Sequence, residues 1–389
     1  MTVTITPSKL SGAITPPPSK SQAHRVLIAA ALAGEGSIIR NLARSQDIEA
    51  TQRCMDALRR TGEELPLLDC GESGSTLRFL IPVALALRGG GCFTGRGRLM
   101  ERPQKPYFDL FNEMGILYGR TGNLLTVRGA LRPGEYHLPG DVSSQFLTGL
   151  LYALPLLDGE SRIVLTTELE SRNYVDMTLE ALAAFGVKAA WTDDRTLRVP
   201  GRQTYQPARV TVEADWSQAG FWYAARGLGN PVKVTGMNPD SAQGDKRVVP
   251  YCELLCGPGT VELDVSQCPD LVPALAAHAV LRAGAVTRIV NAGRLRIKES
   301  DRLAAVREEL CALGGKVSEG PDSLTITGVE ALSGGAADSH NDHRIAMMVA
   351  VAATRCTGAV TLTGAESVRK SYPDFWMDYA RLGGEIVQA

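Results

Sequence analysis

LFNEMGILYGRTGNLLTVRG, residues 110–129, contains the pattern that decides the fold of this chain. Its first part is a helical segment that stops at Gly115, and two short runs rich in apolar and β-branched residues follow, separated by a polar turn. A glycine directly after a helix suits a left-handed C-cap, and turn residues between two such runs indicate neighbouring strands. The stretch therefore predicts a helix, a glycine cap and a pair of strands.

The same outline recurs along the chain. Residues 181–201 and 309–328 repeat it clearly, and residues 54–65, 251–263 and 377–389 repeat it more weakly. The copies recur at roughly 50 to 75 residues, too long for a short solenoid repeat, so each is a small α/β unit. One helix–glycine–strand succession is typical of any α/β protein. Six of them predict two domains of three repeats, with helices inside and sheets outside.

Composition and charge set limits on the function. The chain has 389 residues, 44% hydrophobic and 21% charged, which is ordinary for a two-domain protein. A formal net charge of -1 excludes a globally basic nucleic-acid binder, so any anion site must be built by local placement of cations. The eight cysteines form no C-x-x-C pair, so we expect most of them to be small buried residues in a reducing cytosol.

Targeting and membrane segments are not expected. The start, MTVTITPSKL, lacks a basic segment followed by an apolar core, so it does not resemble a signal peptide. The longest apolar run, FLIPVALAL at residues 79–87, is far too short to span a bilayer.

PPPSKSQAHRVLIAAALAG, residues 16–34, predicts a helix with an unusual start. The prolines cannot lie inside a helix, so the helix covers about residues 22–32, with Ser19 or Ser21 as N-cap and Gly34 as the stop.

The charges around this helix start leave two interpretations open. Lys20 and Arg25 stand near the start, and no acidic residue lies in the first turn to balance the helix dipole. An external anion would supply that charge, and a plain serine cap would explain the same residues.

Six further helix starts carry cations or small hydroxylated residues. These are Gly71, Gly74 and Arg78; Arg102 before Pro103; Ser143, Ser144 and Gln145; Ser171, Arg172 and Tyr174; Lys298, Glu299 and Arg302, with a helix expected to start at Ser300; and His343 and Arg344, with Arg369 and Lys370 further on. Each alone is equally a capped helix, a solvated cationic loop or a salt-bridged helix end. Together, in a near-neutral chain, they indicate a site for more than one anionic group.

Seven motifs in order, SKSQAHR, GSTLR, ERPQKPYFDLFNEMG, GDVSSQFLTGLL, RIKESDRL, NDHRIAM and RKSYPDFW, resemble the 5-enolpyruvylshikimate-3-phosphate (EPSP) synthase family of carboxyvinyltransferases over nearly the whole chain. The resemblance implies a two-domain inside-out α/β barrel of six βαβαββ-type repeats. Two repeats, around residues 58–70 and 251–263, are too short for every strand. The implied domains are 19–213 and 1–18 with 214–389, with the active site in the cleft between them.

The implied reaction transfers the enolpyruvyl group of phosphoenolpyruvate to the 5-hydroxyl of shikimate 3-phosphate in the shikimate pathway, and releases phosphate without a metal or organic cofactor. Such chemistry needs an acid, a base and fixed cations. The implied catalytic residues are Asp270, Glu299, Lys298 and Lys20. Those implied for shikimate 3-phosphate are Lys20, Ser21, Arg25, Ser143, Ser144, Gln145, Ser171, Tyr174, Asp270, Arg294 and Lys298. Those implied for phosphoenolpyruvate are Lys20, Gly74, Arg102, Gln145, Arg302, Arg344 and Lys370.

Three residues depart from the family pattern. Glu72 stands where asparagine is common, Arg294 where an asparagine often contacts the sugar phosphate, and Trp216 in a stretch that is usually small and hydroxylated. Glu72 is expected to point away from the site or to pair with a nearby arginine. We expect the two short repeats to change stability or packing rather than the chemistry.

Two alternative functions stay open at this point. One is the related carboxyvinyltransferase that acts on UDP-N-acetylglucosamine, which would show a different first motif and a reactive loop cysteine. The other is a non-catalytic sugar-phosphate binder that uses the same cleft. In every case we expect a cytoplasmic monomer with small-molecule substrates and no nucleic-acid or membrane partner.

Overall fold

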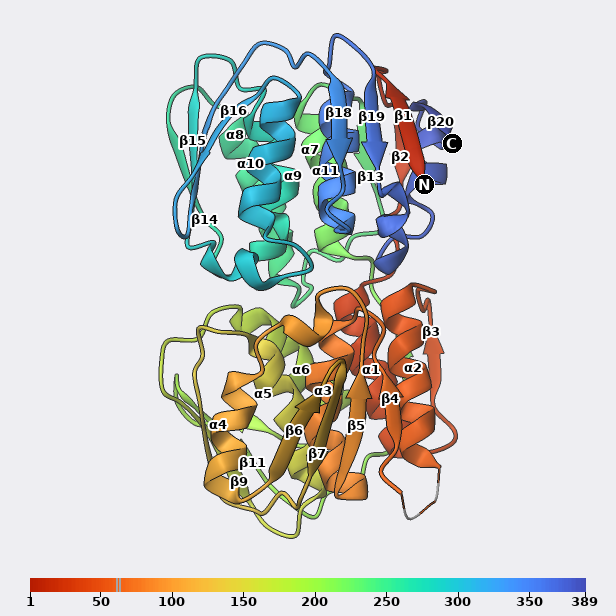
Figure 1. The fold of residues 1–389 in the computed structure, drawn as a ribbon, viewed down its shortest axis with the longest axis vertical. Helices are drawn as coiled ribbons and strands as arrows, with labels where there is room; N and C mark the ends of the chain where they lie inside the picture. The colour runs from red at the N-terminus through yellow and green to blue at the C-terminus, as the bar shows by residue number, and fades with distance from the viewer. Residues whose placement is uncertain (61, 63) are drawn as a thin grey trace. The chain divides into compact units, whose positions relative to one another are not determined.

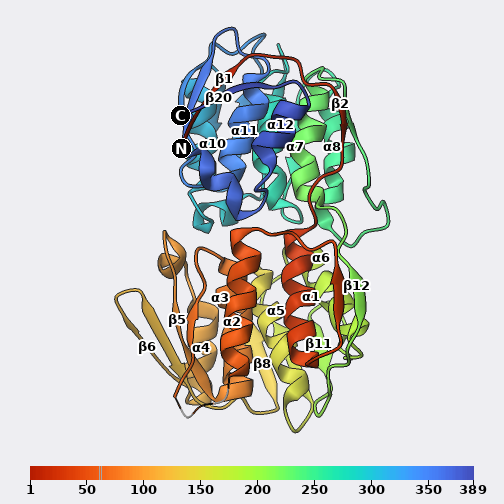
Figure 2. The same cartoon turned by 90° about the vertical axis from the view of Figure 1, so that its right-hand side faces the viewer.

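The computed structural model describes residues 1–60, 62 and 64–389, which fold as two compact units. The central unit is Pro18–Glu213, and the discontinuous unit joins Met1–Pro17 to Ala214–Ala389. Each unit has its own hydrophobic core and combines helices with small sheets, as predicted for an α/β fold. In each unit the strands lie outside the helices (Figures 1 and 2).

The central unit repeats one pattern of helices and short strands, and its described elements follow in chain order. They are α1 (Lys20–Ala33), β3 (Ile38–Arg40), α2 (Gln46–Arg59), β4 (Leu67–Asp69), α3 (Gly74–Arg88), β5 (Gly90–Thr94), the 3₁₀ turn η1 (Leu99–Glu101), α4 (Lys105–Met114), β6 (Leu117–Thr121), β7 (Leu124–Arg128), β8 (Glu135–Leu138), α5 (Ser144–Ala153), η2 (Leu154–Leu156), β9 (Ser161–Leu165), α6 (Arg172–Ala184), β10 (Ala190–Trp191), β11 (Thr196–Val199) and β12 (Arg209–Thr211). Its sheets have the orders β4-β5-β7-β6, β10-β11-β9-β8 and β12-β3.

The discontinuous unit has the same pattern of helices and short strands, and it includes both ends of the chain. Its elements are β1 (Thr2–Thr6), β2 (Gly12–Ile14), α7 (Trp216–Gly227), β13 (Val232–Val234), η3 (Gly244–Arg247), α8 (Val248–Leu255), β14 (Val261–Asp264), η4 (Pro269–Leu271), α9 (Val272–Ala279), β15 (Val286–Val290), η5 (Gly293–Ile297), α10 (Arg302–Ala312), β16 (Lys316–Glu319), β17 (Leu324–Thr327), β18 (Gly335–Asp338), α11 (His343–Ala353), β19 (Val360–Thr363), η6 (Ala365–Lys370), α12 (Phe375–Arg381) and β20 (Glu385–Gln388). Its sheets have the orders β14-β15-β17-β16, β18-β19-β1-β20 and β13-β2.

The stretch 110–129 folds as predicted. Helix α4 ends at Met114, and Gly115 caps it with a φ of 69°. Strands β6 and β7 then pair antiparallel, so β4-α3-β5-α4-β6-β7 forms one complete βαβαββ repeat around a four-stranded sheet. A residue with a Cβ would be strained at that φ, which explains the glycine.

One complete repeat is closed by the two ends of the chain. After α12, strand β20 pairs antiparallel with the N-terminal strand β1, with Val3 opposite Gln388. β1 also pairs with β19, so it lies between β19 and β20 in a sheet whose other strands come from the C-terminal region.

Two repeats are shortened, as predicted. The chain runs from α2 into β4 and from α8 into β14, and each of these strands belongs to the four-stranded sheet of the next repeat. In the part of the chain that the structure describes, the repeats containing α1–α2 and α7–α8 therefore keep only the two-stranded parallel sheets β12-β3 and β13-β2.

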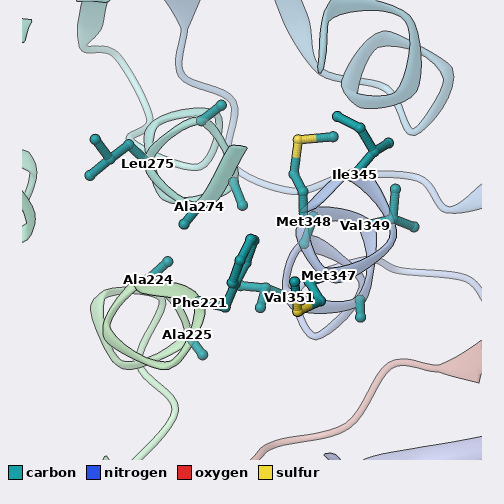
Figure 3. Packing of buried hydrophobic residues seen from close by; sticks show 14 of the residues in the cluster. Phe221, Ala224, Ala225, Ala274, Leu275, Ile345, Met347, Met348, Val349 and Val351 are labelled. Atoms are coloured by element: carbon teal, nitrogen blue, oxygen red, sulfur yellow. The ribbon is translucent and has the colours of Figure 1, made fainter. Parts of the chain in front are cut away.

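The central helices are buried on all sides, which explains their continuous apolar sequences. Every residue of α11 is buried, and residues 79–85 of the apolar run 79–87 are buried in helix α3. Figure 3 shows Phe221 of α7 between small residues of α9 and the methionines of α11. Among the described residues, no helix has the length and apolarity needed to cross a membrane.

Candidate active site

The predicted site residues fall into two groups, one in each unit. The central unit holds Lys20, Ser21, Arg25, Gly74, Arg102, Ser143, Ser144, Gln145, Ser171 and Tyr174. The discontinuous unit holds Asp270, Arg294, Lys298, Glu299, Arg302, Arg344 and Lys370.

In the central unit, four helices have serine at the N-cap and no acidic residue in the first turn. Ser19 caps α1 and accepts a hydrogen bond from the Gln22 amide at 3.4 Å, whereas Ser21 lies inside the first turn. Ser73 caps α3, Ser143 caps α5 and Ser171 precedes α6, and the first turns of all four helices lack acidic residues. Each start therefore presents unbalanced positive dipole charge, which favours an anion.

Arg25 ties α1 to α6. Its guanidinium donates to the Thr178 hydroxyl at 2.9 Å and to the Tyr174 carbonyl of α6 at 2.8 Å. It also donates to the Ser21 carbonyl at 2.7 Å and lies 5.8 Å from the centre of the Tyr174 ring. Burial lowers the pKa of Arg25. Three predicted residues from α1 and α6 are thus brought together.

Lys20 has an acidic partner that the sequence did not reveal. Its ammonium lies 2.9 Å from a carboxylate oxygen of Asp47, in the first turn of α2, and Asp47 is 7% exposed. A carboxylate placed there fixes the position of the lysine ammonium. An acidic residue in a first helical turn is common, so its sequence position alone carries no functional signal.

Gln145 and Arg102 are held by backbone and side-chain contacts near the start of α3. The Gln145 amide accepts from Arg78 at 2.7 Å and donates to Ser75 at 3.0 Å. A Cβ on Gly74 would lie 2.6 Å from an Arg102 nitrogen, so only glycine lets this guanidinium approach the helix start. These contacts bring Gly74, Arg102 and Gln145 into one region of the central unit.

A buried hydroxyl chain supports this group. The His24 imidazole contacts the Thr51 hydroxyl at 2.7 Å, Thr51 contacts Thr76 at 2.7 Å, and Thr76 donates to the Ser73 cap at 2.7 Å. Burial, together with the charges of Lys20 and Arg25, holds the pKa of His24 well below its usual value, so the ring is neutral. The chain joins α1, α2 and α3 at the ends where the site residues lie.

We expect Thr51→Val to destabilise the protein by about 1–3 kcal/mol, because it leaves buried hydrogen-bonding groups of His24 and Thr76 without this partner. Valine has nearly the same shape as threonine, so the lost hydroxyl is the main change. Thr51→Ser keeps the hydroxyl and is the matched control. Urea midpoints measure the difference, and an equal loss in both variants would contradict the role of the hydroxyl.

In the discontinuous unit, Asp270 of η4 is surrounded by cations. Its carboxylate accepts from Arg302 at 3.0 Å and from Arg344 at 2.9 Å, and the Lys298 ammonium lies at 3.5 Å. Burial raises the pKa of Asp270, but the charges of Arg344, Lys298 and Arg302 outweigh it, so the pKa lies well below its usual range. The group is an ionised carboxylate at neutral pH.

Arg302 also binds two other carboxylates. It donates to Asp342 at 2.7 Å and to Glu299 at 2.6 Å, and its side chain is 2% exposed. Burial lowers the pKa of Arg302, but Asp342, Glu299 and Asp270 outweigh it and raise the pKa. Asp342 is fully buried and also caps α11 through the Arg344 amide at 2.9 Å. The sequence analysis missed Asp342, although it lies in the motif NDHRIAM.

The predicted helix start at Ser300 was wrong by two residues. Asp301 is the N-cap of α10, where its carboxylate accepts from the Ala304 amide at 3.2 Å, and the helix begins at Arg302. The Ser300 hydroxyl instead donates to Asp342 at 3.1 Å. Lys298 therefore does not share a helix with Arg302, and the two cations meet at Asp270.

Two more predicted residues lie on neighbouring segments. The Lys370 ammonium, at the end of η6, donates to the Asn341 carbonyl at 2.5 Å, and Lys370 is buried. Arg294 lies in η5 and donates to the Ser266 carbonyl at 2.5 Å.

The remaining departures from the family pattern have structural roles. A Cβ on Gly97 would lie 2.7 Å from a Glu72 carboxylate oxygen, so this side chain packs onto the loop between Arg96 and Arg98. Trp216 opens α7, where its indole donates to the Asn238 carbonyl at 3.0 Å and stacks on Tyr223.

Cysteines take little part in either group. All eight are free thiols, and five of them are buried, which confirms the expected burial of most of them. Among the described residues there is no cluster of three or more histidine, cysteine, aspartate or glutamate side chains arranged to hold a metal ion.

The comparisons with known proteins agree on one family. The family model described as EPSP synthase (3-phosphoshikimate 1-carboxyvinyltransferase) matches residues 5–254 and 257–378. The 3-phosphoshikimate 1-carboxyvinyltransferase of Clostridium kluyveri is 45% identical over 99% of this chain and 98% of its own. That of Clostridium perfringens is 43% identical over 98% of each chain.

Solved structures show the same fold. EPSP synthase from Acinetobacter baumannii has a TM-score of 0.78 at 23% identity and covers 100% of both chains. The enolpyruvyl transferase NikO from Streptomyces tendae has a TM-score of 0.76 at 18% identity, over 100% of this chain and 98% of its own. The family predicted from seven ordered motifs is confirmed. The chain therefore belongs to the EPSP synthase (3-phosphoshikimate 1-carboxyvinyltransferase) family.

Proposed function

We propose that this protein transfers the enolpyruvyl group of phosphoenolpyruvate to the 5-hydroxyl of shikimate 3-phosphate and releases phosphate, as part of aromatic amino acid biosynthesis. Relatives that are 43–45% identical are named 3-phosphoshikimate 1-carboxyvinyltransferase, and the match covers 98% of their length. The structural observation that best supports the proposal is a cluster in the discontinuous unit. It consists of two carboxylates, Asp270 and Glu299, and three cations, Lys298, Arg302 and Arg344.

The central unit supplies the residues proposed for shikimate 3-phosphate. Lys20, Ser21 and Arg25 lie at the start of α1, and the serines and Gln145 lie at the start of α5. First-turn helix amides and side-chain hydroxyls suit a phosphate and a polyhydroxylated ring. Ser171 and Tyr174 at the start of α6 complete this group in the central unit, and Asp270, Arg294 and Lys298 are proposed from the other unit.

Phosphoenolpyruvate carries a carboxylate and a phosphate, and both need cations. We assign Lys20, Gly74, Arg102 and Gln145 of the central unit, and Arg302, Arg344 and Lys370 of the discontinuous unit, to this substrate. Arg302 and Arg344 both donate to the Asp270 carboxylate. Their guanidinium groups are therefore arranged to bind a carboxylate, and the carboxylate of phosphoenolpyruvate would share them with Asp270. The expectation that the two units close over the substrates stays a prediction.

The proposed chemistry is a proton-balanced addition and elimination. Glu299 gives a proton to the methylene carbon, Asp270 takes the proton of the attacking hydroxyl, and the new C–O bond forms a tetrahedral adduct. Glu299 then takes a proton back from the methyl group while the C–O bond to phosphate breaks. The Asp270 proton passes to the departing phosphate, and Lys298 stabilises the negative charge that develops.

Binding of a substrate anion would raise the pKa of Asp270, which suits its proposed role as a base. Without substrate, the charges of Arg344, Lys298 and Arg302 hold this pKa well below its usual range, so the carboxylate is ionised but weakly basic. A substrate carboxylate that shares Arg302 and Arg344 would weaken their hold on Asp270 and raise its basicity.

The test is the choice of acceptor. Purified protein is supplied with phosphoenolpyruvate and either shikimate 3-phosphate or UDP-N-acetylglucosamine, and products are identified by mass spectrometry. We expect a carboxyvinyl adduct of shikimate 3-phosphate alone. An adduct of the nucleotide sugar alone would overturn the proposal. Tight binding of shikimate 3-phosphate without any adduct would indicate a non-catalytic binder.

Lys20→Ala is expected to lower kcat/KM by about 10²-fold while the fold stays intact, because it removes a fixed cation from the proposed site of both substrates. The matched control is Lys105→Ala. Lys105 is an exposed lysine in the first turn of α4, and its ammonium lies 2.5 Å from the Asp109 carboxylate, so the variant also loses a paired lysine near a helix start. Steady-state kinetics and circular dichroism measure the two effects. A fully active Lys20→Ala enzyme would contradict the assignment.

Members of this family act on small-molecule substrates. We propose further that the protein works in the cytoplasm as a monomer, without nucleic-acid or membrane partners, a view supported by its net charge of -1.

A further inference from the structure

The turn between β18 and α11 has an unusual backbone. His340 and Asn341 have φ values of 52° and 53°, so two consecutive residues with side chains lie in the left-handed region. Such a backbone is strained and persists only where its surroundings hold it in place. The turn leads directly into Asp342, the carboxylate that binds Arg302.

Glu309 of α10 holds this turn. One of its carboxylate oxygens contacts the His340 imidazole at 2.7 Å, and the other accepts from the Asp338 amide at 2.9 Å. The Asp338 carboxylate in turn accepts from the His340 amide at 2.6 Å. The Glu309 side chain is 9% exposed and that of His340 is 30% exposed. A single carboxylate thus fixes both the strand end and the histidine.

Residues 341 and 342 of this turn contact two cations that we assign to phosphoenolpyruvate. The Asn341 carbonyl accepts from the Lys370 ammonium at 2.5 Å, and Lys370 is 4% exposed. The next residue, Asp342, binds Arg302 and caps the helix that begins with His343 and Arg344. A change in the backbone of Asn341 would therefore move the oxygen that positions Lys370.

We propose that His340 is a positioning residue for the reaction: its contact with Glu309 holds the turn 339–342 in the conformation in which the Asn341 carbonyl places Lys370 for phosphoenolpyruvate. This role rests on the proposed function, because it concerns how well one of the two substrates binds. His340 itself does not touch the reacting atoms. Its effect reaches the substrate through Asn341 and Lys370.

The contact depends on pH. The hydrogen bond to Glu309 raises the pKa of His340, burial opposes it, and the charges of Glu309, Asp338 and Glu308 add to the increase. Glu308 and Glu309 face the ring from α10, and Asp338, which itself accepts from Thr363 of β19, faces it from β18. Because the folded pKa is raised above its ordinary value near 6.5, the charged contact is complete below that pH and is lost as pH rises through the raised pKa.

The experiment measures KM for phosphoenolpyruvate against pH in the full-length wild type, His340→Gln and His340→Phe. Glutamine donates to Glu309 without titrating, whereas phenylalanine cannot donate. For each protein we compare the ratio of KM at pH 9 to KM at pH 6. We expect this ratio to be about fivefold larger in the wild type than in His340→Gln. In His340→Phe we expect KM to be about fivefold higher throughout. The value of kcat and the KM for shikimate 3-phosphate should stay within about twofold.

The matched control is His137→Gln, which alters an exposed histidine 3.0 Å from Glu135 in the central unit and should leave every profile unchanged. Identical pH profiles of the wild type and His340→Gln, together with a wild-type KM in His340→Phe, would overturn the proposal.

A second readout separates this inference from the proposed function. Hydrogen exchange at residues 339–344 should be faster in His340→Phe than in His340→Gln, and with rising pH the protection of these amides relative to their intrinsic exchange rates should fall in the wild type but not in His340→Gln. If the wild type does not turn over but exchange follows this pattern, the proposed function fails and the positioning of the turn stands. Normal turnover with equal exchange and equal KM in all variants would contradict the positioning role alone.

Discussion

Glu299→Gln is expected to lower kcat by about 10³-fold, because the amide neither gives a proton to the methylene carbon nor takes one back. The substitution changes little else. Glutamine has nearly the same shape as glutamate, and its carbonyl oxygen can accept from Arg302, which lies 2.6 Å from the carboxylate in the wild type. The KM values for both substrates should change much less than kcat. Phosphate release under saturating substrates measures the effect.

Glu319→Gln is the matched control for Glu299→Gln. Glu319 is also a glutamate paired with arginines, with Arg296 at 3.7 Å and Arg307 at 3.6 Å, and it lies in the same unit. We expect its kcat within about twofold of the wild type, because surface pairs of this kind contribute little. A Glu299→Gln enzyme that keeps wild-type kcat would show that another group handles the proton.

Asp342→Asn is expected to lower the free energy of unfolding by about 3 kcal/mol, because it removes a charge from a buried ion pair and leaves Arg302 undercompensated. Asp342 is fully buried, and it joins Arg302, Ser300 and the amide of Arg344. The remaining pairs of Arg302 with Asp270 and Glu299 keep the loss near the lower end of the range for buried pairs. Urea denaturation measures the difference.

Asp374→Asn is the control for that change. Asp374 also precedes a helix, α12, but it is exposed and its side chain makes no capping hydrogen bond. Its loss should be below about 0.5 kcal/mol. Equal stability of Asp342→Asn and the wild type would show that the Arg302 cluster does not depend on this carboxylate.

The local parts of the fold could be predicted from sequence because glycine caps and turn residues are local. Gly115 marked the end of α4, and the spacing after α2 and α8 marked the two short repeats. The closure of one sheet by β1 could not be predicted in this way. It joins Val3 to Gln388, at opposite ends of the chain, and no local pattern reveals such a pairing.

The candidate site could be predicted only for residues in recognisable motifs. Lys20 was found, but its partner Asp47 was missed, because their contact depends on how α1 and α2 pack. The hydroxyl chain through Thr51 was missed for the same reason. The helix α10 was expected to start at Ser300, whereas Asp301 caps it and it begins at Arg302, because the Ser300 hydroxyl turns toward Asp342.

The central claim is that both groups of site residues serve one transfer between two substrates. The most direct test is phosphate release by the wild-type protein with phosphoenolpyruvate alone, with shikimate 3-phosphate alone, and with both together. We predict release only when both substrates are present. Equal release from phosphoenolpyruvate alone, or no release while both substrates bind, would contradict the claim.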